Sequence, residues 1–332
     1  MKSWVNPYAR MISRYIASKF RVWKPLAVFY NITLRCNLRC SFCNLWRRSE
    51  YREVDHENAV KIIRRICEAG IPGLGFSGGE PLLRADLVEL AFEAKDYGVI
   101  TSVNTNGTLI TEGNAERLSK AFDYIILSLD DIGIMHDEVR GIRGVYDKVL
   151  EAVDILKRYG ATVGINTVAT RDNIPRITML WRNLSDRVDF FTIQPVNPPQ
   201  MVDEKLSSKL IEELHVFRKT TNASIPLPRS YLDGMAKYMS GDICKICDAG
   251  RLYLAIQPNG DVIPCSIRDD AILGNILEED LESIIDRNKK DLVHIVNKCG
   301  GCWLTCTTGI SLTFRKPLEV IGSYVKLGLR IC

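Results

Sequence analysis

Six apolar segments of strand length alternate with segments of helical periodicity along the first two thirds of the chain. The strand-like segments lie near 26–33, 73–77, 99–104, 124–128, 161–168 and 189–195, and the helical segments lie near 57–69, 84–97, 113–120, 145–159, 174–184 and 206–219. Such regular alternation predicts a parallel sheet whose helices cover its outside. We therefore expect an α/β fold whose functional residues lie where the strands end.

The two ends of the chain carry its positive charge. Residues 1–30 hold six basic side chains and no acidic one, and residues 314–332 add a net charge of +3, so the total of +4 leaves the body at −5. This distribution argues against nucleic-acid binding over a broad surface and favours a local anionic partner.

An aromatic and apolar stripe recurs at helical spacing near the N-terminus. It is formed by Tyr8, Ile12, Tyr15, Ile16 and Phe20. A helix of this kind either lies on an anionic membrane surface or packs on its own domain with its arginines in water. The apolar residues of the C-terminal tail add to the membrane interpretation.

The composition is that of a folded globular protein. The chain has 332 residues, of which 46% are apolar and 25% charged, which excludes a disordered chain and suits one large domain with a smaller one. No uncharged apolar run is long enough to cross a membrane, and the first residues do not resemble a signal peptide. We expect a cytoplasmic protein, with peripheral attachment at the inner face of the membrane as a further option.

Eleven cysteines point to metal chemistry, because disulfides are rare in the cytoplasm. Cys67 lies on the apolar face of a predicted helix and is expected to be a core residue. Cys36, Cys40 and Cys43 stand within eight residues, in a loop that follows the first apolar run. A structural zinc ion wants four ligands, and no fourth one stands nearby. Three thiolates on a four-iron cluster instead leave one iron open to a small molecule.

The spacing CxxxCxxC, with the aromatic Phe42 before its last cysteine, resembles the signature of the radical S-adenosylmethionine (SAM) superfamily. Gly78-Gly79-Glu80 follows the second apolar run and is similar to the family's GGE motif, in which glycine backbone and the carboxylate receive the amino group of SAM. The run that ends in Ser128-Leu129-Asp130 resembles the family's ribose-contacting strand, with Ser128 and Asp130 as hydrogen-bond partners.

Further strand-end residues complete the site that this resemblance implies. Arg140 and Arg143 are both similar to the arginine that pairs with the SAM carboxylate, and the sequence does not choose between them. Asn166 and Gln194 would contact SAM or substrate, or else form a polar plug at the end of the barrel. The implied cofactor-binding set is Phe42, Gly78, Gly79, Glu80, Asn104, Ser128, Asp130, Arg140, Arg143, Asn166 and Gln194, beside the catalytic cluster ligands Cys36, Cys40 and Cys43.

A second cysteine group surrounds a predicted β-hairpin at 258–261. Cys247, Gly260 and Cys265 resemble the opening motif of the SPASM/twitch extension of radical SAM enzymes. Only a CxxCxxxC segment follows, which is shorter than a full SPASM domain, so the resemblance implies one auxiliary [4Fe-4S] cluster. The preferred ligands are Cys247, Cys265, Cys299 and Cys302, with Cys306 or Cys244 as exchangeable alternatives. A three-cysteine site at Cys244, Cys247 and Cys265 with an open iron, and a zinc ribbon, remain as other interpretations.

The expected architecture is a partial (β/α)6 radical SAM barrel followed by a small α+β cysteine-rich domain. The predicted parts are a basic amphipathic helix at 1–25, the barrel at 26–225, the auxiliary-cluster domain at 226–313 and a basic apolar tail at 314–332.

The resemblance implies reductive cleavage of SAM at the [4Fe-4S] cluster to a 5′-deoxyadenosyl radical, which abstracts hydrogen from an unactivated C–H bond. The protein must then seat SAM, exclude water and place one substrate hydrogen. A ferredoxin- or flavodoxin-like reductant is the expected partner. The basic, aromatic ends favour a membrane-associated lipid or prenyl substrate, and a ribosomal-peptide maturase or a cofactor-biosynthesis enzyme is the alternative. An iron–sulfur electron carrier would not need the strand-end motifs.

Overall fold

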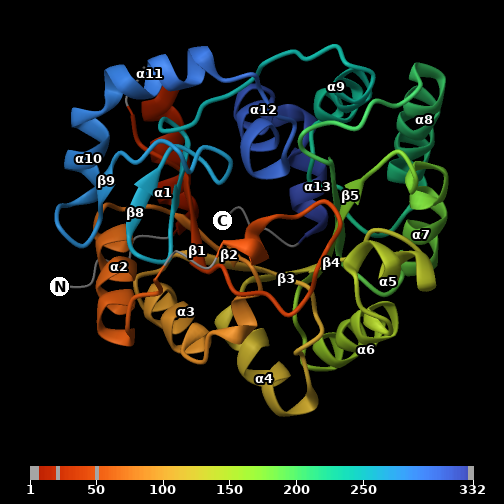
Figure 1. Ribbon diagram of the computed structural model, residues 1–332, viewed down its shortest axis with the longest axis horizontal. Helices are drawn as coiled ribbons and strands as arrows, with labels where there is room; N and C mark the ends of the chain where they lie inside the picture. Colours follow the sequence, from red (N-terminus) through yellow and green to blue (C-terminus); the bar gives the residue numbers. More distant parts are fainter. Residues whose placement is uncertain (1–6, 20–22, 49–51, 328–332) are drawn as a thin grey trace.

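The computed structural model describes residues 7–19, 23–48 and 52–327. A nine-stranded sheet runs through it in the order β6-β5-β4-β3-β2-β1-β7-β8-β9. The first six strands are β1 (Ala27–Thr33), β2 (Gly73–Gly78), β3 (Ile100–Thr105), β4 (Tyr124–Ser128), β5 (Val163–Ala169) and β6 (Phe190–Pro195). All neighbours among these six are parallel, so the predicted parallel sheet of a six-stranded partial barrel is confirmed (Figure 1).

Helices cover the outer face of this sheet (Figure 1). They are α2 (His56–Glu68), α3 (Leu87–Asp96), α4 (Glu112–Ala121), α6 (Val145–Arg158), α7 (Ile177–Leu184) and α8 (Glu204–Thr220), with the short α5 (Ile134–Arg140) before α6. The helix predicted at 84–97 begins only at Leu87, because Pro81–Leu83 form a 3₁₀ turn and Arg84 after it is extended. The sequence did not predict α5, whose seven residues are too few to display a helical period.

Alternate residues of the barrel strands face the side of the sheet opposite the covering helices, which we call the trough. Ser102 and Asn104 of β3 are partly exposed between buried neighbours, and Ser128, Asn166 and Thr192 repeat this alternation on the next strands. Ser128 pairs with Asn166, and Asn166 pairs with Thr192, so the three form a row across the sheet. The inner face therefore presents hydroxyl and amide groups here, whereas the outer face packs apolar side chains against the helices.

The cysteine-rich segment extends the same sheet. Its strand β7 (Tyr253–Ile256) lies parallel to β1, with Tyr253 opposite Ala27. The predicted hairpin forms between β7 and β8 (Asp261–Ile263), and β9 (Gly274–Asn275) follows antiparallel to β8. The helices of this part are α9 (Arg229–Met239), α10 (Leu281–Arg287), α11 (Lys289–Lys298) and α12 (Ile310–Arg315), with a π-helical turn at Thr305–Gly309.

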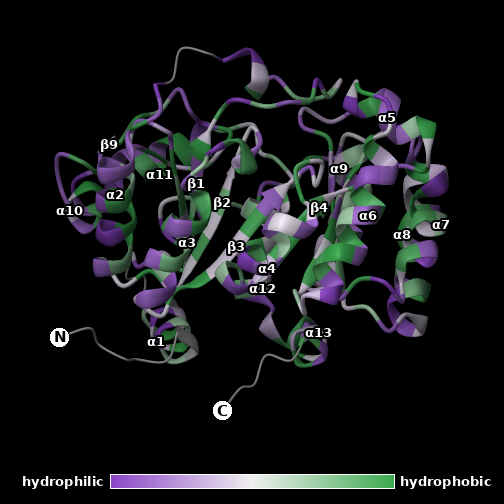
Figure 2. Ribbon diagram, turned by 90° about the horizontal axis from the view of Figure 1, so that it is seen from below, coloured by the Kyte–Doolittle hydropathy of each residue, from purple (hydrophilic) through white to green (hydrophobic). Residues whose placement is uncertain are grey.

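The first and last helices lie at the amino ends of the barrel strands. Arg14 of α1 (Pro7–Lys19) donates to the carbonyl of Pro25 at 3.1 Å, just before β1 begins. Lys326 of α13 (Ile321–Lys326) donates to the carbonyl of Thr221 at 3.3 Å. Both helices lie along one edge of the molecule in Figure 2.

The N-terminal helix packs on its own domain through a few side chains. The ring of Tyr15 lies 4.8 Å from that of Phe314 in α12, while Ile12 and Ile16 point to solvent. The side chain of Tyr8 and all of Phe20, which belong to the predicted stripe, lie outside the described residues. In the part of the chain that the structure describes, no helix is long and apolar enough to span a bilayer.

Candidate active site

The loop that carries Cys36, Cys40 and Cys43 lies at the carboxyl end of β1. Two backbone hydrogen bonds attach it to the end of α5, from Arg39 N to the Arg140 carbonyl at 3.1 Å and from Ser41 N to the Val139 carbonyl at 2.9 Å. Burial raises the pKa of the Cys36 thiol, and the thiols of Cys40 and Cys43 add to the rise. The three sulfur atoms are thus close enough to interact, as ligands of one cluster must be.

Gly78 and Gly79 let the end of β2 press against this cysteine loop. Gly79 N donates to the Thr33 carbonyl and Glu80 N to the Arg35 carbonyl, both at 2.8 Å. A Cβ on Gly78 would lie 2.0 Å from the Thr33 oxygen, and one on Gly79 would lie 2.1 Å from the Arg35 oxygen. The sequence predicted close approach of SAM at these glycines. In the structure, the backbone of the cysteine loop lies so close that only a residue without a side chain fits at these two positions. The contact with SAM stays a prediction.

Glu80 is completely buried, and the chain itself uses its carboxylate. Its Oε1 accepts from Leu82 N at 3.0 Å and from the Thr105 hydroxyl at 2.7 Å, and its Oε2 accepts from Asn106 N at 2.7 Å. Burial raises the pKa of Glu80, and these hydrogen bonds oppose the rise. The carboxylate therefore joins the ends of β2 and β3, and its contact with the SAM amino group stays a prediction.

Arg140 rather than Arg143 points into the site. The Arg140 Nη2 lies 2.6 Å from Asp130 Oδ2, and both side chains are buried. Its Nη1 donates to Cys40 Sγ at 3.7 Å, and its guanidinium lies 5.5 Å from the centre of the Phe42 ring. Arg143 is exposed on the surface. Of the two arginines that the sequence left open, Arg140 is therefore the one placed beside the cluster loop.

The remaining candidates line the trough, with one exception. Asn104 and Ser128 are partly exposed at their strand ends, and Asn166 accepts through Oδ1 from the Thr192 hydroxyl at 3.0 Å. Gln194 Oε1 accepts from the backbone N–H and the hydroxyl of Thr305, at 3.2 and 3.0 Å. This contact joins β6 to the segment between Cys302 and Cys306, so Gln194 connects the barrel to the auxiliary cysteines.

Two asparagines that the sequence interpretation missed hold the cysteine loop to the end of β3. Asn106 Nδ2 donates to Asn37 Oδ1, and Asn37 Nδ2 donates to the Thr108 hydroxyl, each at 2.8 Å. Asn37 lies inside the CxxxCxxC motif and Asn106 inside an Asn-Gly turn. The turn was a local signal for Asn106, but only the fold shows that it meets Asn37.

Five of the six candidate auxiliary cysteines come together near β7. Burial raises the pKa of Cys265 to about 12, with smaller contributions from Cys302 and Cys247. Burial likewise raises the pKa of Cys306, with contributions from Cys302 and Cys265, and the Cys299 thiol adds to the rise at Cys247. Cys244 is exposed and stands outside this electrostatic group.

Trp303 fixes the segment that carries Cys302 and Cys306. Its indole N–H donates to the Tyr231 carbonyl, and the Tyr231 hydroxyl donates to the Trp303 carbonyl, both at 2.9 Å. A Cβ on Gly234 of α9 would lie only 2.1 Å from the indole ring. This tight packing presents the two thiols from a rigid element.

Hydroxyl groups lie next to two of the grouped sulfur atoms. The Tyr253 hydroxyl is 3.3 Å from Cys247 Sγ, and the Thr307 hydroxyl is 3.1 Å from Cys302 Sγ. When the sulfur atoms are thiolate ligands they can only accept, so both hydroxyls would donate. Hydrogen bonds to ligand sulfur are one of the ways in which a protein adjusts the potential of an iron–sulfur cluster.

We expect Tyr253→Phe to make the reduction potential of the auxiliary cluster more negative without loss of iron. The donated hydrogen bond withdraws electron density from the Cys247 thiolate and so stabilises the reduced cluster. The potential is measured by a redox titration followed by electron paramagnetic resonance. Tyr146→Phe, at a half-exposed tyrosine on α6, is the control. An unchanged potential in Tyr253→Phe would contradict the expectation.

Both cysteine groups supply the thiols that an iron–sulfur cluster needs. Among the described residues, no three His, Cys, Asp or Glu side chains converge tightly enough to hold one metal ion. A four-iron cluster places iron and sulfide between its ligands and needs only neighbouring thiols with a favourable approach. The Cys36, Cys40 and Cys43 loop, with one face turned to the polar trough, and the five-thiol group meet that requirement.

Two known domain types match the two cysteine groups. The radical SAM superfamily matches residues 30–178, which include β1 to β5 and the Cys36–Cys43 loop. The chain belongs to the radical SAM superfamily. The SPASM iron–sulfur cluster-binding domain matches residues 247–303, which include Cys247, Cys265, Cys299 and Cys302. The cofactors that these two matches imply are SAM and [4Fe-4S] clusters.

Relatives of this radical SAM chain include synthases and cyclases. The AdoMet-dependent heme synthase of Oleidesulfovibrio alaskensis is 32% identical over 208 residues, which are 59% of this chain and 54% of that protein. The PqqA peptide cyclase of Granulibacter bethesdensis is 29% identical over 262 residues, 73% of this chain and 67% of the cyclase. The chain spans about half the length of the heme synthase it matches.

A solved structure shares the fold. Streptococcus suis SuiB superposes with a TM-score of 0.68 at 21% identity, covering 85% of this chain and 72% of SuiB. At 21% identity, this similarity supports a shared fold and nothing further.

The expectation of a lipid substrate finds no support. Neither relative is named for a lipid. The basic ends that motivated the expectation lie at the amino ends of the strands, whereas the cysteine loop follows the carboxyl end of β1. A membrane at α1 and α13 would therefore be on the wrong side to deliver a lipid to the trough.

Proposed function

We propose that this protein is a radical SAM enzyme that removes hydrogen from an unactivated C–H bond of a carboxylate-bearing cofactor precursor. The observation that carries the proposal is the placement of two thiol groups around one polar trough. Cys36, Cys40 and Cys43 lie at its carboxyl end, and the five grouped thiols of the SPASM segment flank β7. A ferredoxin- or flavodoxin-like reductant is part of the proposal.

Residues of the barrel would hold the cofactors as follows. Cys36, Cys40 and Cys43 would bind the first cluster, with Arg140 beside Cys40 to receive the SAM carboxylate. Four of the thiols Cys247, Cys265, Cys299, Cys302 and Cys306 would bind the auxiliary cluster. Together the bound cluster and SAM supply a one-electron cleavage that yields a carbon radical able to take hydrogen from an alkyl position.

The chain's own contribution is positioning in a site poor in charge. Asn166 and Thr192 offer amide and hydroxyl groups that can orient a bound molecule without drawing ions and their water into the trough. Glu80 holds the ends of β2 and β3 together and so keeps the cysteine loop against the barrel. Phe42, under the Arg140 guanidinium, shields the buried Arg140–Asp130 pair.

Arginines around the cysteine loop support a carboxylate-bearing substrate. Between residues 34 and 52 the chain has five arginines, of which Arg35 pairs with Glu53 and Arg48 with Asp269. The guanidinium groups of Arg39 and Arg47 each lie 4.7 Å from the Trp46 ring centre, which holds two cations at the entrance. Heme precursors carry several carboxylates, and the heme synthase is the relative that matches this chemistry.

Peptide modification is the second candidate. The uncharged trough, with Asn166 and Thr192 side by side, suits the amide groups of a peptide. The PqqA peptide cyclase aligns with a larger share of this chain than the heme synthase does, 73% against 59%.

Binding of coproporphyrin, a tetracarboxylate, separates the two candidates. We expect the reconstituted enzyme to bind it in equilibrium dialysis at least fivefold more tightly than its methyl ester, as about 1 kcal/mol per exposed ion pair predicts. Arg47→Gln should weaken binding several-fold, whereas Arg117→Gln, on the surface of α4, should not. Equal binding of acid and ester would reject the carboxylate substrate, and deoxyadenosine formation stimulated only by a peptide would favour the second candidate.

A further inference from the structure

The helix α1 packs on the protein through Tyr15 but leaves its two isoleucines, Ile12 and Ile16, pointing outward. Its Arg14 points inward and donates to the carbonyls of Pro25 and Ala69. Ile12 and Ile16, one turn apart, are each 52% exposed. A surface helix normally buries its aliphatic residues and leaves its arginines in water. Here the contacts of Arg14 fix the opposite orientation.

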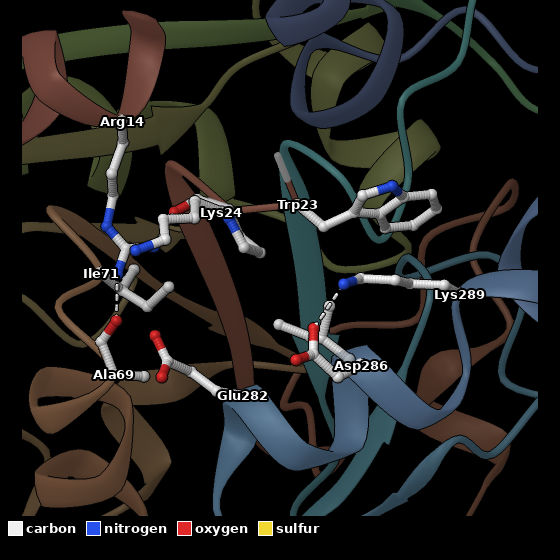
Figure 3. A pocket seen from close by; sticks show the side chains of 10 residues that line it. Arg14, Trp23, Lys24, Ala69, Ile71, Glu282, Asp286 and Lys289 are labelled. Atoms are coloured by element: carbon white, nitrogen blue, oxygen red, sulfur yellow. Dashed lines mark hydrogen bonds and ion pairs between the residues drawn. The ribbon is translucent and has the colours of Figure 1, made fainter. Parts of the chain in front are cut away.

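The space behind α1 explains why so little of the helix is buried. A cavity of about 390 Å³ separates it from α10, and Arg14, Trp23 and Lys24 line it on one side (Figure 3). Glu282 and Asp286 face them from α10, and Asp286 is paired with Lys289 at 2.7 Å. The lining also includes apolar side chains such as Ile71 and Ile285, but Ile12 and Ile16 are not part of it and remain exposed.

The helix α13 repeats this inverted arrangement at the other end of the chain. Its Ser323 faces inward, where the hydroxyl accepts from Arg218 at 3.2 Å and the carbonyl accepts from the Ser224 hydroxyl at 2.8 Å. Val325 and Ile321, one turn apart, point outward and are 58% and 44% exposed. Leu318, just before the helix, is 83% exposed.

Both apolar faces lie on one side of the molecule. The two helices lie along the same edge in Figure 2, and both contact chain segments at the amino ends of barrel strands. Pro25 precedes β1, and Ser224 is bridged to Phe190 at the start of β6. Aliphatic side chains more than half exposed at two places on one face mark an interaction surface.

Charge identifies the partner of this face. The two terminal segments that contain the helices, residues 1–30 and 314–332, carry net charges of +6 and +3, against −5 for the rest of the chain. Aliphatic residues on helices that belong to two net-basic segments suit the boundary of an anionic bilayer, where the side chains enter the interface and the cations meet phosphate. We infer that the face formed by α1 and α13 docks on an anionic membrane surface, with Ile12, Ile16, Leu318, Ile321 and Val325 in the interface.

This orientation has a consequence for the trough. The cysteine loop follows the carboxyl end of β1, so docking through the amino ends turns the trough away from the bilayer. The membrane would hold the enzyme in place, and the substrate would enter from the aqueous side. The inference does not depend on the proposed reaction, because it concerns binding of the whole chain to vesicles.

Vesicle co-sedimentation of the full chain tests the inference. We expect binding to vesicles of phosphatidylcholine with one quarter phosphatidylglycerol and not to vesicles of phosphatidylcholine alone. The double variants Ile12→Glu with Ile16→Glu, and Leu318→Glu with Val325→Glu, should each lower the bound fraction about tenfold, because a carboxylate replaces buried apolar area. Raising the salt to about 1 M, where the Debye length falls to about 3 Å, should also release the protein.

A matched double variant controls for general surface charge. Ile134→Glu with Met135→Glu changes two exposed aliphatic residues on α5, which are 53% and 41% exposed and lie near the opposite edge (Figure 2). It should bind vesicles like the unmodified protein, and circular dichroism should show that all variants are folded. No vesicle binding, or binding that both test variants retain, would overturn the inference. A dimer in light scattering that the same substitutions dissociate would assign the face to a second copy instead.

Discussion

Cys40→Ala will abolish reductive cleavage of SAM and lower the iron content of the reconstituted protein from about eight to about four atoms per chain. Cys40 is the most buried cysteine of the first loop, 8% exposed, and it lies between Cys36 and Cys43 with the Arg140 guanidinium against its sulfur. Its removal leaves two thiolates, which are too few to hold a four-iron cluster with one open iron.

The measurement is iron counting after anaerobic reconstitution, together with deoxyadenosine formed in the presence of dithionite. Cys67→Ala is the matched control, because Cys67 is also buried but packs in the core beneath α2. It should keep both its iron and its activity. Cys244→Ser should do the same, since Cys244 is exposed and outside the auxiliary group. Full deoxyadenosine formation in Cys40→Ala would refute the assignment of the first cluster.

Arg140→Met will destabilise the protein by about 3–5 kcal/mol, because it leaves the completely buried carboxylate of Asp130 without its partner. Without Arg140, the hydrogen bond that Asp130 Oδ1 accepts from Val168 N at 2.9 Å would compensate only part of the buried charge. Urea unfolding of the protein before reconstitution measures the loss. SAM binding should be lost as well if Arg140 receives its carboxylate.

Two further variants separate stability from SAM binding in this experiment. Arg143→Met should change neither, because Arg143 is exposed on the surface. Adding Asp130→Asn to Arg140→Met removes the uncompensated charge and should recover part of the stability without recovering SAM binding. A stable Arg140→Met protein with normal SAM affinity would show that the Arg140–Asp130 pair contributes neither to stability nor to SAM binding.

The strands and the first cysteine loop could be predicted from the sequence because their signals lie within short stretches of it. The apolar runs near 26–33 and 189–195 correspond to β1 and β6 almost residue for residue. Cys36, Cys40 and Cys43 lie within one turn-forming loop, so their spacing alone brings the three sulfur atoms together. The same holds for the hairpin of β7 and β8, which an Asn-Gly turn predicts.

Contacts between segments that are far apart in the sequence could not be predicted from local patterns. Besides its expected role toward SAM, Glu80 accepts hydrogen bonds from Thr105 and Asn106, about 25 residues further along the chain. Gln194 reaches Thr305 across 111 positions. No local pattern tells a side chain which strand end it will meet, because that depends on how the parallel strands are ordered and how far each extends.

The sequence by itself thus determined the class of fold, the first cysteine loop and the presence of a second cysteine group, since all three rest on periodicity and spacing within short stretches. Only the tertiary structure decided which arginine lies beside Cys40, which five thiols form the second group, and on which side of the barrel the basic ends lie. The physical reason is the same in each case. Burial and electrostatic pairing act between groups that the folded sheet brings close together, and the hydrophobic periodicity of the sequence does not show which groups those are.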